Sequence, residues 1–376
     1  MSPRVLVVFL CGLLFFSCTQ PVGAQAPSQY LPAMEAGGGT DFGLALLNSD
    51  TADASVMVTA RTYDGLTVTG AGIVNPANLI IPASGKLELR PEDIFGSAIS
   101  GLAGWLEISP STSAVKAYSF VFDGALTELE GVAVTSTPSS RLIFPKVSAG
   151  SGTVLHVVNT SSAPVDSTIS LYDNTGVIVA SIPVSLPALS GFVRTADDLI
   201  QGNPSFDGYA VVQSSGTLFA PQSLAGFETY HNQSDLAAVR GIPAGGALPS
   251  GYWPHFASGG GYASRLTLIN TTETPQTLQI SASTDASGTA SVTRTLMPNE
   301  RMDESVAEVF GFSSQLPAAG SLQFSTQSNV AAFVGVLEYS TADGASLSAA
   351  EPQSQAQSDF YFTHLLESEG YYTGVA

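Results

Sequence analysis

Cysteine is nearly absent from this 376-residue chain, which contains only Cys11 and Cys18, both within an apolar N-terminal stretch. The rest of the sequence therefore offers no disulfide, no thiolate nucleophile and no cysteine ligand for a metal. An exported chain without disulfides is more typical of bacteria than of animals, whose small extracellular domains are often disulfide-bonded.

Positive charge is scarce as well, and Lys86, Lys116 and Lys146 are the only lysines. Twelve Lys and Arg stand against 31 Asp and Glu, which gives a formal net charge of −19. Binding of nucleic acid without sequence preference requires clustered cations that displace counterions from phosphates. The composition therefore argues against nucleic acid as a partner, and the scattered acidic residues favour solubility.

Charged residues of both signs make up only 11% of the sequence, whereas hydrophobic residues make up 44%. Disordered acidic segments combine high charge with few apolar residues, so the chain does not belong to that class. The 37 glycines and 22 prolines, together with abundant Ser, Thr and Val, favour short strands joined by tight turns.

The start of the chain, at positions 1–24, has the pattern of a secretory signal peptide. A short positive stretch at 1–4 precedes an apolar run at 5–16 and the small residues Val22-Gly23-Ala24. The apolar run is short for a membrane span. We therefore expect cleavage after Ala24, a secreted, extracellular or cell-surface location, and no membrane span in the mature chain. The alternatives are cleavage after Ala26, an uncleaved anchor, and lipidation of Cys18, where bulky Phe residues fit the lipoprotein pattern poorly.

An internal repeat organises the rest of the sequence. Four similar openings recur at nearly even intervals, with their third positions at 32, 145, 254 and 363; they are Tyr30-Leu31-Pro32, Ile143-Phe144-Pro145, Tyr252-Trp253-Pro254 and Tyr361-Phe362-Thr363. The first three are each followed by an alternating strand that ends in Asn48, Asn159 or Asn270. A period of roughly 110 residues is too long for a solenoid unit and suits a β-sandwich that folds independently.

The pattern predicts an all-β fold with about seven strands per unit, packed as two sheets. We expect β-sandwich repeats at residues 25–140, 141–250 and 251–358, followed at 359–376 by the first strand of a truncated fourth unit in a longer array. The linkers are short and rich in Pro, Gly, Ser, Ala or Gln, which predicts a semi-rigid string of units.

The repeat, with its aromatic-x-Pro opening and its strand ending in Asn, resembles tandem Ig-like or fibronectin-type β-sandwich modules of exported bacterial surface proteins. The Cys…Trp…Cys signature of true Ig domains is missing. The resemblance implies a role as a spacer, an adhesin or a binding module, and it assigns no catalytic residues.

Enzyme motifs are absent from the sequence, including the nucleophile elbow, H-E-x-x-H, phosphate loops and EF-hand loops. We therefore expect no enzymatic activity and no cofactor. His255 and His364 occupy repeat positions where earlier units carry Ala33 and Lys146, which argues against a metal site repeated with the units.

Acidic pairs recur at similar places in the units, as Glu92-Asp93, Asp197-Asp198 and Asp303-Glu304. Carboxylates at these positions are expected to cap short helices, because free N–H groups at a helix N-terminus favour them. The alternative is calcium binding, for which Asp197, Asp198, Asp303 and Glu304 are the candidates.

Aromatic residues gather at the start of the third unit, where Tyr252, Trp253 and Tyr262 are candidates for a ligand-binding platform. Because bulky residues open every repeat, we favour packing at joints between units for these openings. The Asn at each strand end is expected to form an Asx-type turn.

These features predict a non-enzymatic exported structural or adhesive repeat protein, with a surface glycan or another surface protein as its partner. The alternative is a string of carbohydrate-binding modules that accompanied an extracellular enzyme.

Overall fold

The computed structural model describes residues 26–35, 40–125, 128–200, 202–215, 223–232, 235–284, 288–313 and 316–355, together with two short strands at 367–368 and 371–372. The predicted signal peptide, both cysteines and most of residues 359–376 lie outside the described residues. Strands account for 59% of the structure and helices for 7%, which confirms the predicted all-β fold. Within the described residues, no helix has the length and apolar character needed to cross a membrane.

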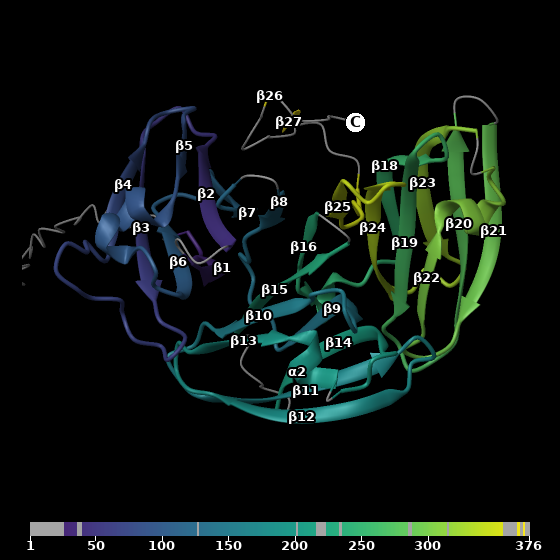
Figure 1. Ribbon diagram of the computed structural model, residues 1–376, viewed down its shortest axis with the longest axis horizontal. Coiled ribbons are helices and arrows are strands. Elements are labelled where there is room, and N and C mark those ends of the chain that lie inside the picture. The colour runs from purple at the N-terminus through teal and green to yellow at the C-terminus, as the bar shows by residue number, and fades with distance from the viewer. Residues whose placement is uncertain are drawn as a thin grey trace, which may run out of the picture.

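The strands fall into three consecutive segments (Figure 1). Segment I comprises β1 (Gln29–Met34), β2 (Thr40–Asn48), β3 (Ala54–Arg61), β4 (Ala77–Ile81), β5 (Lys86–Leu89), α1 (Pro91–Phe95), a 3-10 turn (Ser97–Ile99), β6 (Gly104–Pro110), β7 (Val115–Asp123) and β8 (Leu129–Ala133). Segment II comprises β9 (Arg141–Ser148), β10 (Val154–Asn159), β11 (Val165–Asp173), β12 (Ile178–Leu186), β13 (Gly191–Thr195), α2 (Ala196–Ile200), β14 (Asp207–Ser214), β15 (Leu224–His231), β16 (Leu236–Arg240), β17 (Ile242–Pro243) and a 3-10 turn (Ala244–Gly246).

Segment III comprises β18 (Ser250–Ser258), β19 (Tyr262–Asn270), β20 (Gln276–Thr284), β21 (Gly288–Leu296), β22 (Arg301–Ser305), α3 (Val306–Phe310), β23 (Ala318–Thr326), β24 (Phe333–Thr341) and β25 (Leu347–Ala350). Near the C-terminus, β26 (Glu367–Ser368) and β27 (Tyr371–Tyr372) pair with each other.

The same topology occurs in all three segments. One sheet of each, which we name the opening sheet, has the order β1-β6-β3-β4, β9-β14-β11-β12 or β18-β23-β20-β21, with β17 added beside β9. The other, the closing sheet, has the order β5-β2-β7-β8, β13-β10-β15-β16 or β22-β19-β24-β25. All strand pairs in these sheets are antiparallel.

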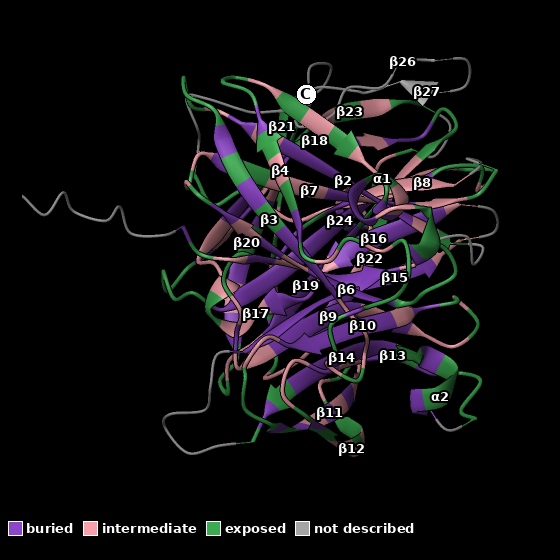
Figure 2. Cartoon of the chain, turned by 90° about the vertical axis from the view of Figure 1, so that its left-hand side faces the viewer, coloured by how far each residue is buried: buried purple, intermediate pink, exposed green. Residues whose placement is uncertain are grey.

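Each pair of sheets encloses apolar side chains, because alternate residues of a strand point to opposite faces. On β20, Leu278, Ile280 and Ala282 are buried in the core of segment III, whereas the residues between them are not. Trp253 of the opening sheet belongs to the same cluster as Leu266 of the closing sheet. Buried residues run along the central strands (Figure 2), so each segment is a two-layer sandwich.

A short helix connects the two sheets in every segment, and a side chain three residues beyond the N-cap satisfies the free backbone N–H groups at its start. Asp93 accepts from the Arg90 N–H at 3.0 Å, Asp198 from the Thr195 N–H at 3.3 Å, and Glu308 from the Ser305 N–H at 3.0 Å. The predicted caps at Asp93 and Asp198 are therefore present. In segment III the cap is Glu308, and Asp303 lies on β22.

The segments are arranged as an arc, with segment II between the other two (Figure 1). The opening sheet of each packs on the closing sheet of the next, and residues from neighbouring segments share buried clusters. The linkers predict a semi-rigid string of units. The contact between neighbouring segments is more extensive than that prediction, because they meet through buried surfaces as well as through linkers.

Candidate functional site

Two hydrogen bonds define the joint between segments I and II. The Trp105 indole N–H donates to the Leu189 carbonyl at 3.1 Å, and the Gly191 N–H donates to the Tyr63 carbonyl at 2.8 Å. Trp105 is fully buried at the start of β6. Its ring packs in a cluster with Val158 and Ala225 of segment II. A ring of this size buries a large apolar area, so this joint is a stabilising contact.

The same two bonds recur between segments II and III. The Tyr209 hydroxyl donates to the Asn299 carbonyl at 2.8 Å, and the Arg301 N–H donates to the Asn174 carbonyl at 3.1 Å. Tyr209 matches Trp105 in position, since each follows a glycine near the start of β14 or β6. The acceptors match too, because Leu189 and Asn299 have φ values of 57° and 60° in the turn before the edge strand. The docking geometry is therefore repeated along the chain.

The second joint also holds a buried ionic cluster. The Lys146 ammonium lies 3.0 Å from Asp303 and 2.8 Å from Glu338, so a cation of segment II pairs with two carboxylates of segment III. Arg301, whose side chain is 0% exposed, bonds Asp303 at 2.6 Å and reaches back to Asp207 at 3.2 Å. Breaking a buried pair leaves an uncompensated charge, so these contacts hold the joint in one geometry.

Two carboxyl groups in this cluster have opposite pKa shifts. Burial opposes ionisation of Asp303, but Arg301, Lys146 and Arg265 together outweigh it and hold the Asp303 pKa well below its usual range. For Glu228, burial is the largest effect and raises the pKa to about 8. The hydrogen bond from the Lys146 backbone N–H and the charge of the Lys146 ammonium both act to lower this pKa, but they do not outweigh burial. Glu228 is fully buried, and among the described residues its Oε2 atom has no hydrogen-bond partner.

The predicted calcium candidates do not come together. Asp197 and Asp198 lie in the first turn of α2, Asp303 pairs with three cations, and Glu304 lies 3.8 Å from Arg294. Within the described ranges, no group of three or more His, Cys, Asp or Glu is placed to hold a metal ion.

The aromatic candidates are separated. Trp253 is 1% exposed and packs against Phe324 in the core of its own segment, with its indole N–H donating to the Ala350 carbonyl at 2.9 Å. Trp253 is therefore neither an exposed platform nor a joint residue. Tyr252 is 42% exposed on the opening sheet, whereas Tyr262 is 55% exposed on β19 of the closing sheet.

In two of the three segments, the first residue of the opening lies at a joint. Tyr30 packs beside Trp105 at the first joint, and Ile143 belongs to the buried cluster of the second. The equivalent Tyr252 is exposed. Sequence reasoning missed Trp105 and Tyr209, and the available signal was an aromatic residue after a glycine near the start of the same strand in two units.

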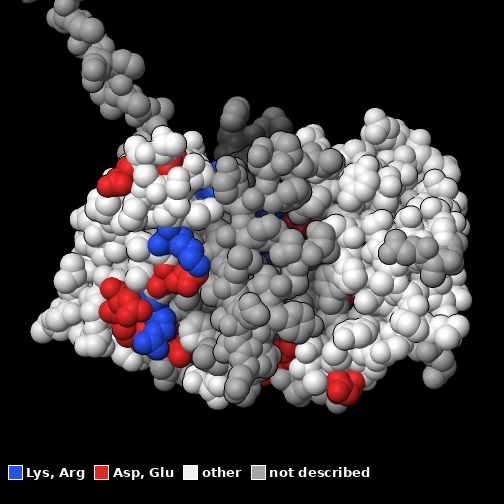
Figure 3. All heavy atoms as spheres, turned by 90° about the horizontal axis from the view of Figure 1, so that it is seen from above, with Lys and Arg blue, Asp and Glu red and all other residues white. Residues whose placement is uncertain are grey.

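The opening sheet of segment III presents an outward face of hydroxyl and amide side chains. Ser321 occupies the position of Trp105 and Tyr209 and is exposed. The polar and aromatic members of this face are Ser250, Tyr252, Thr277, Gln279, Ser281, Ser283, Thr289, Ser291, Thr293, Thr295, Ser321, Gln323 and Ser325. None of these side chains is charged. Charged side chains are also sparse on the molecular surface seen in Figure 3.

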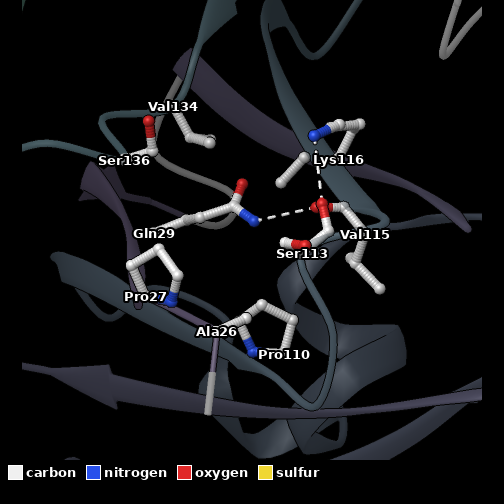
Figure 4. Close-up of a pocket in the computed structure, with 10 residues that line it drawn as sticks. Ala26, Pro27, Gln29, Pro110, Ser113, Val115, Lys116, Val134 and Ser136 are labelled. Atoms are coloured by element: carbon white, nitrogen blue, oxygen red, sulfur yellow. Dashed lines mark hydrogen bonds between the residues drawn. The ribbon is translucent and has the colours of Figure 1, made fainter. Parts of the chain in front are cut away.

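Several hollows are formed by described residues elsewhere, and one of about 320 Å³ lies beside α2, where Asp197 is its only charged lining residue among those described. Another, of about 300 Å³, lies between β1 and the start of β7 (Figure 4); Gln29 donates across it to the Val115 carbonyl at 3.1 Å, and Lys116 is its only charged lining residue. A third, of about 430 Å³, lies where β8, β16 and β25 meet, beside a bidentate Arg240–Glu351 pair. Their described lining residues do not include a nucleophile paired with a base.

No protein-family model and no curated protein matches this sequence.

Proposed function

We propose that this chain is a non-enzymatic, exported structural or adhesive protein in which three β-sandwich units are docked into one rigid body. The repeated joint is the observation that supports this role most strongly. Two bonds occur at both junctions: one from an aromatic donor to a turn carbonyl, and one from the backbone of an edge strand to a turn carbonyl of the preceding segment. An array that reproduces one docking geometry fixes the distance and angle between its ends.

Rigidity is useful to a protein that spaces or presents a surface. Buried aromatic rings at both joints and the buried ionic cluster at the second oppose relative motion of the units. A flexible linker would instead lose entropy each time a bound partner fixed the orientation of the units. The signal-peptide pattern and the lack of cysteine after residue 18 suit an exported chain that needs no oxidative folding.

The alternative, a string of carbohydrate-binding modules, requires each unit to offer an equivalent binding face. The joints cover part of the opening sheets of segments I and II, including Trp105 and Tyr209. In segment III, β18 and β23 carry several exposed residues, whereas their counterparts β1 and β6 of segment I and β9 and β14 of segment II are mostly buried. The structure therefore favours a rigid array over a string of three equivalent binding modules.

The test uses residues 25–376 as a soluble chain. Coated on beads, it is assayed for retention on surfaces carrying polysaccharides or extracellular proteins, while the same soluble polymers and peptides are incubated with it and analysed by mass spectrometry. We expect the beads to be retained on at least one of these surfaces, with no new products. Product formation that depends on the chain would show an enzyme and contradict the proposal.

A further inference from the structure

We propose that the outward face of the opening sheet of segment III binds an uncharged polysaccharide. This inference rests on the adhesive role proposed above and names the class of ligand and the face that takes it. The sheet β18-β23-β20-β21 lies at the end of the arc, with β21 at its outer edge (Figure 1).

The side chains of this face form a regular array. One row across the strands is Gln353, Tyr252, Gln323, Ser281 and Ser291, in which each backbone pairs with the next. A second row is Ser250, Ser325, Gln279 and Thr293. Strands lie about 4.8 Å apart, so successive polar groups are spaced closely enough to contact one extended polymer.

The absence of charge on the face selects the kind of polymer. The outward residues of the corresponding sheets include charges, namely Arg61 and Glu107 in segment I and Arg141 and Asp166 in segment II. In segment III the cation on these strands is Arg294. It pairs with the buried Leu278 and so belongs to the inner face of the sheet, where it lies 3.8 Å from Glu304. An ionic polymer would find no counter-charge here, whereas hydroxyl and amide groups match the hydroxyls of a neutral sugar chain.

The hydroxyls are already oriented before any ligand binds. Thr277 and Thr295 share a hydrogen bond of 2.8 Å across the strands, as do Ser281 and Ser291. Each hydroxyl retains a further acceptor lone pair after one bond. Because these short side chains sit on paired strands, binding fixes few additional rotamers, and the entropic cost of binding is low.

Tyr252 supplies the apolar contact that a hydroxyl array lacks. The residue is 42% exposed, and its backbone is held on one side by Gln323 of β23 and on the other by two bonds of 2.8 and 2.9 Å with Gln353. An aromatic ring flanked by amides can stack on the apolar face of a sugar while the amides bond its hydroxyls.

The same face is poorly suited to docking another sandwich segment. The two joints depend on Trp105 and Tyr209, whose counterpart here is the short and exposed Ser321. A further segment or a second copy of the chain would find no aromatic anchor at this position. The repeat itself thus distinguishes this face from the joint faces of segments I and II.

The experiment is affinity electrophoresis of residues 25–376 in native gels that contain either a neutral polysaccharide (dextran, hydroxyethyl cellulose, galactomannan, xyloglucan) or a charged one (alginate, chitosan). We expect at least one neutral polymer to retard the protein. Tyr252→Ala should weaken that retardation about tenfold or more, which corresponds to roughly 1.4 kcal/mol. Tyr262→Ala removes a similarly exposed ring from the other sheet and should leave retardation unchanged.

A second variant, the pair Ser281→Asp and Gln323→Glu, adds two charges to the centre of the face and should abolish retardation while thermal unfolding remains cooperative. Three results would overturn the proposal: no retardation by any neutral polymer, retardation by charged polymers only, or equal loss in the Tyr252 and Tyr262 variants. Self-association that depends on Tyr252, seen by light scattering, would also overturn it. If no neutral polymer retards the protein but beads are still retained on protein surfaces, the adhesive role stands and only this ligand is removed.

Discussion

At the residue scale, one asparagine closes the end of the second strand in every segment. Asn48, Asn159 and Asn270 are fully buried. The Asn270 amide donates to three carbonyls at 2.9 to 3.1 Å, and its oxygen accepts the N–H two residues on at 3.0 Å. The expected Asx-type turn is therefore present, and it also ties the strand end to the turn that follows the fourth strand of the segment.

Replacing Asn270 with alanine should destabilise the protein by about 2–3 kcal/mol, because buried carbonyl groups lose their donor. The measurement is urea unfolding followed by circular dichroism. Thr293→Ala, on the exposed face of the same segment, is the matched control and should change stability by no more than about 0.5 kcal/mol. Equal effects in the two variants would show that the buried amide bonds are not structurally important.

The buried carboxyl of Glu228 predicts a dependence of stability on pH. Its pKa in the fold is about 8 and its ordinary value is 4.5, so the folded chain holds a proton that the unfolded chain releases. Stability should therefore fall as pH rises from about 4.5 to about 8 and then level off. Glu228→Gln, which is neutral at every pH, should flatten this decline.

Urea unfolding of both proteins at intervals from pH 5 to pH 9 measures the effect. Burial raises the pKa of Glu130 to about 8 as well, and Glu130 is retained in both proteins, so the difference between the two profiles isolates Glu228. Parallel profiles would mean that Glu228 is ionised in the folded protein throughout this range.

At the scale of the element, one backbone N–H in each joint can be used to follow the opening of that joint by hydrogen exchange. It is the Gly191 N–H at the first joint and the Arg301 N–H at the second. Tyr209→Phe removes only the hydroxyl bond to Asn299 and should cost about 1 kcal/mol. If Arg301 exchanges by local opening of the joint, its amide hydrogen should exchange about fivefold faster, with Gly191 unchanged.

Trp105→Phe provides the reciprocal test, because it removes the indole bond to Leu189. Exchange at Gly191 should accelerate while exchange at Arg301 stays the same, as measured by hydrogen-exchange NMR. Acceleration at both amides in either variant would show that the joints open together and would contradict independent, repeated docking.

Much of each element can be predicted from sequence, because the signals are local. Alternating apolar residues indicate the strands, and Asp93 and Asp198 stand near enough to helix starts to suggest caps. The cap expected at Asp303 is wrong, since its partners Lys146 and Arg301 lie on β9 and on β22 two residues before it. The joint packing favoured for Trp253 is wrong, and so is the alternative of a binding platform, because sequence position does not show which face of a strand a ring occupies.

At the scale of the whole molecule, the repeat predicts units in series but not their docking. The joints depend on pairs far apart in the chain, such as Trp105 with Leu189 and Tyr209 with Asn299. A sequence period indicates that similar units recur, yet it does not say which sheet of one unit meets the next. The exposed polar sheet of segment III can likewise be recognised only once its counterparts are found at joints.

The central claim is that the three segments form one rigid body, and a distance measurement across the arc tests it most directly. Residues 25–376 lack cysteine. Spin labels can therefore be attached through Asn78→Cys in segment I and Thr293→Cys in segment III, both exposed positions. Pulsed electron paramagnetic resonance should give a single narrow distance distribution that is unchanged at high salt, because buried contacts are screened little. A broad or multimodal distribution would contradict the rigid array.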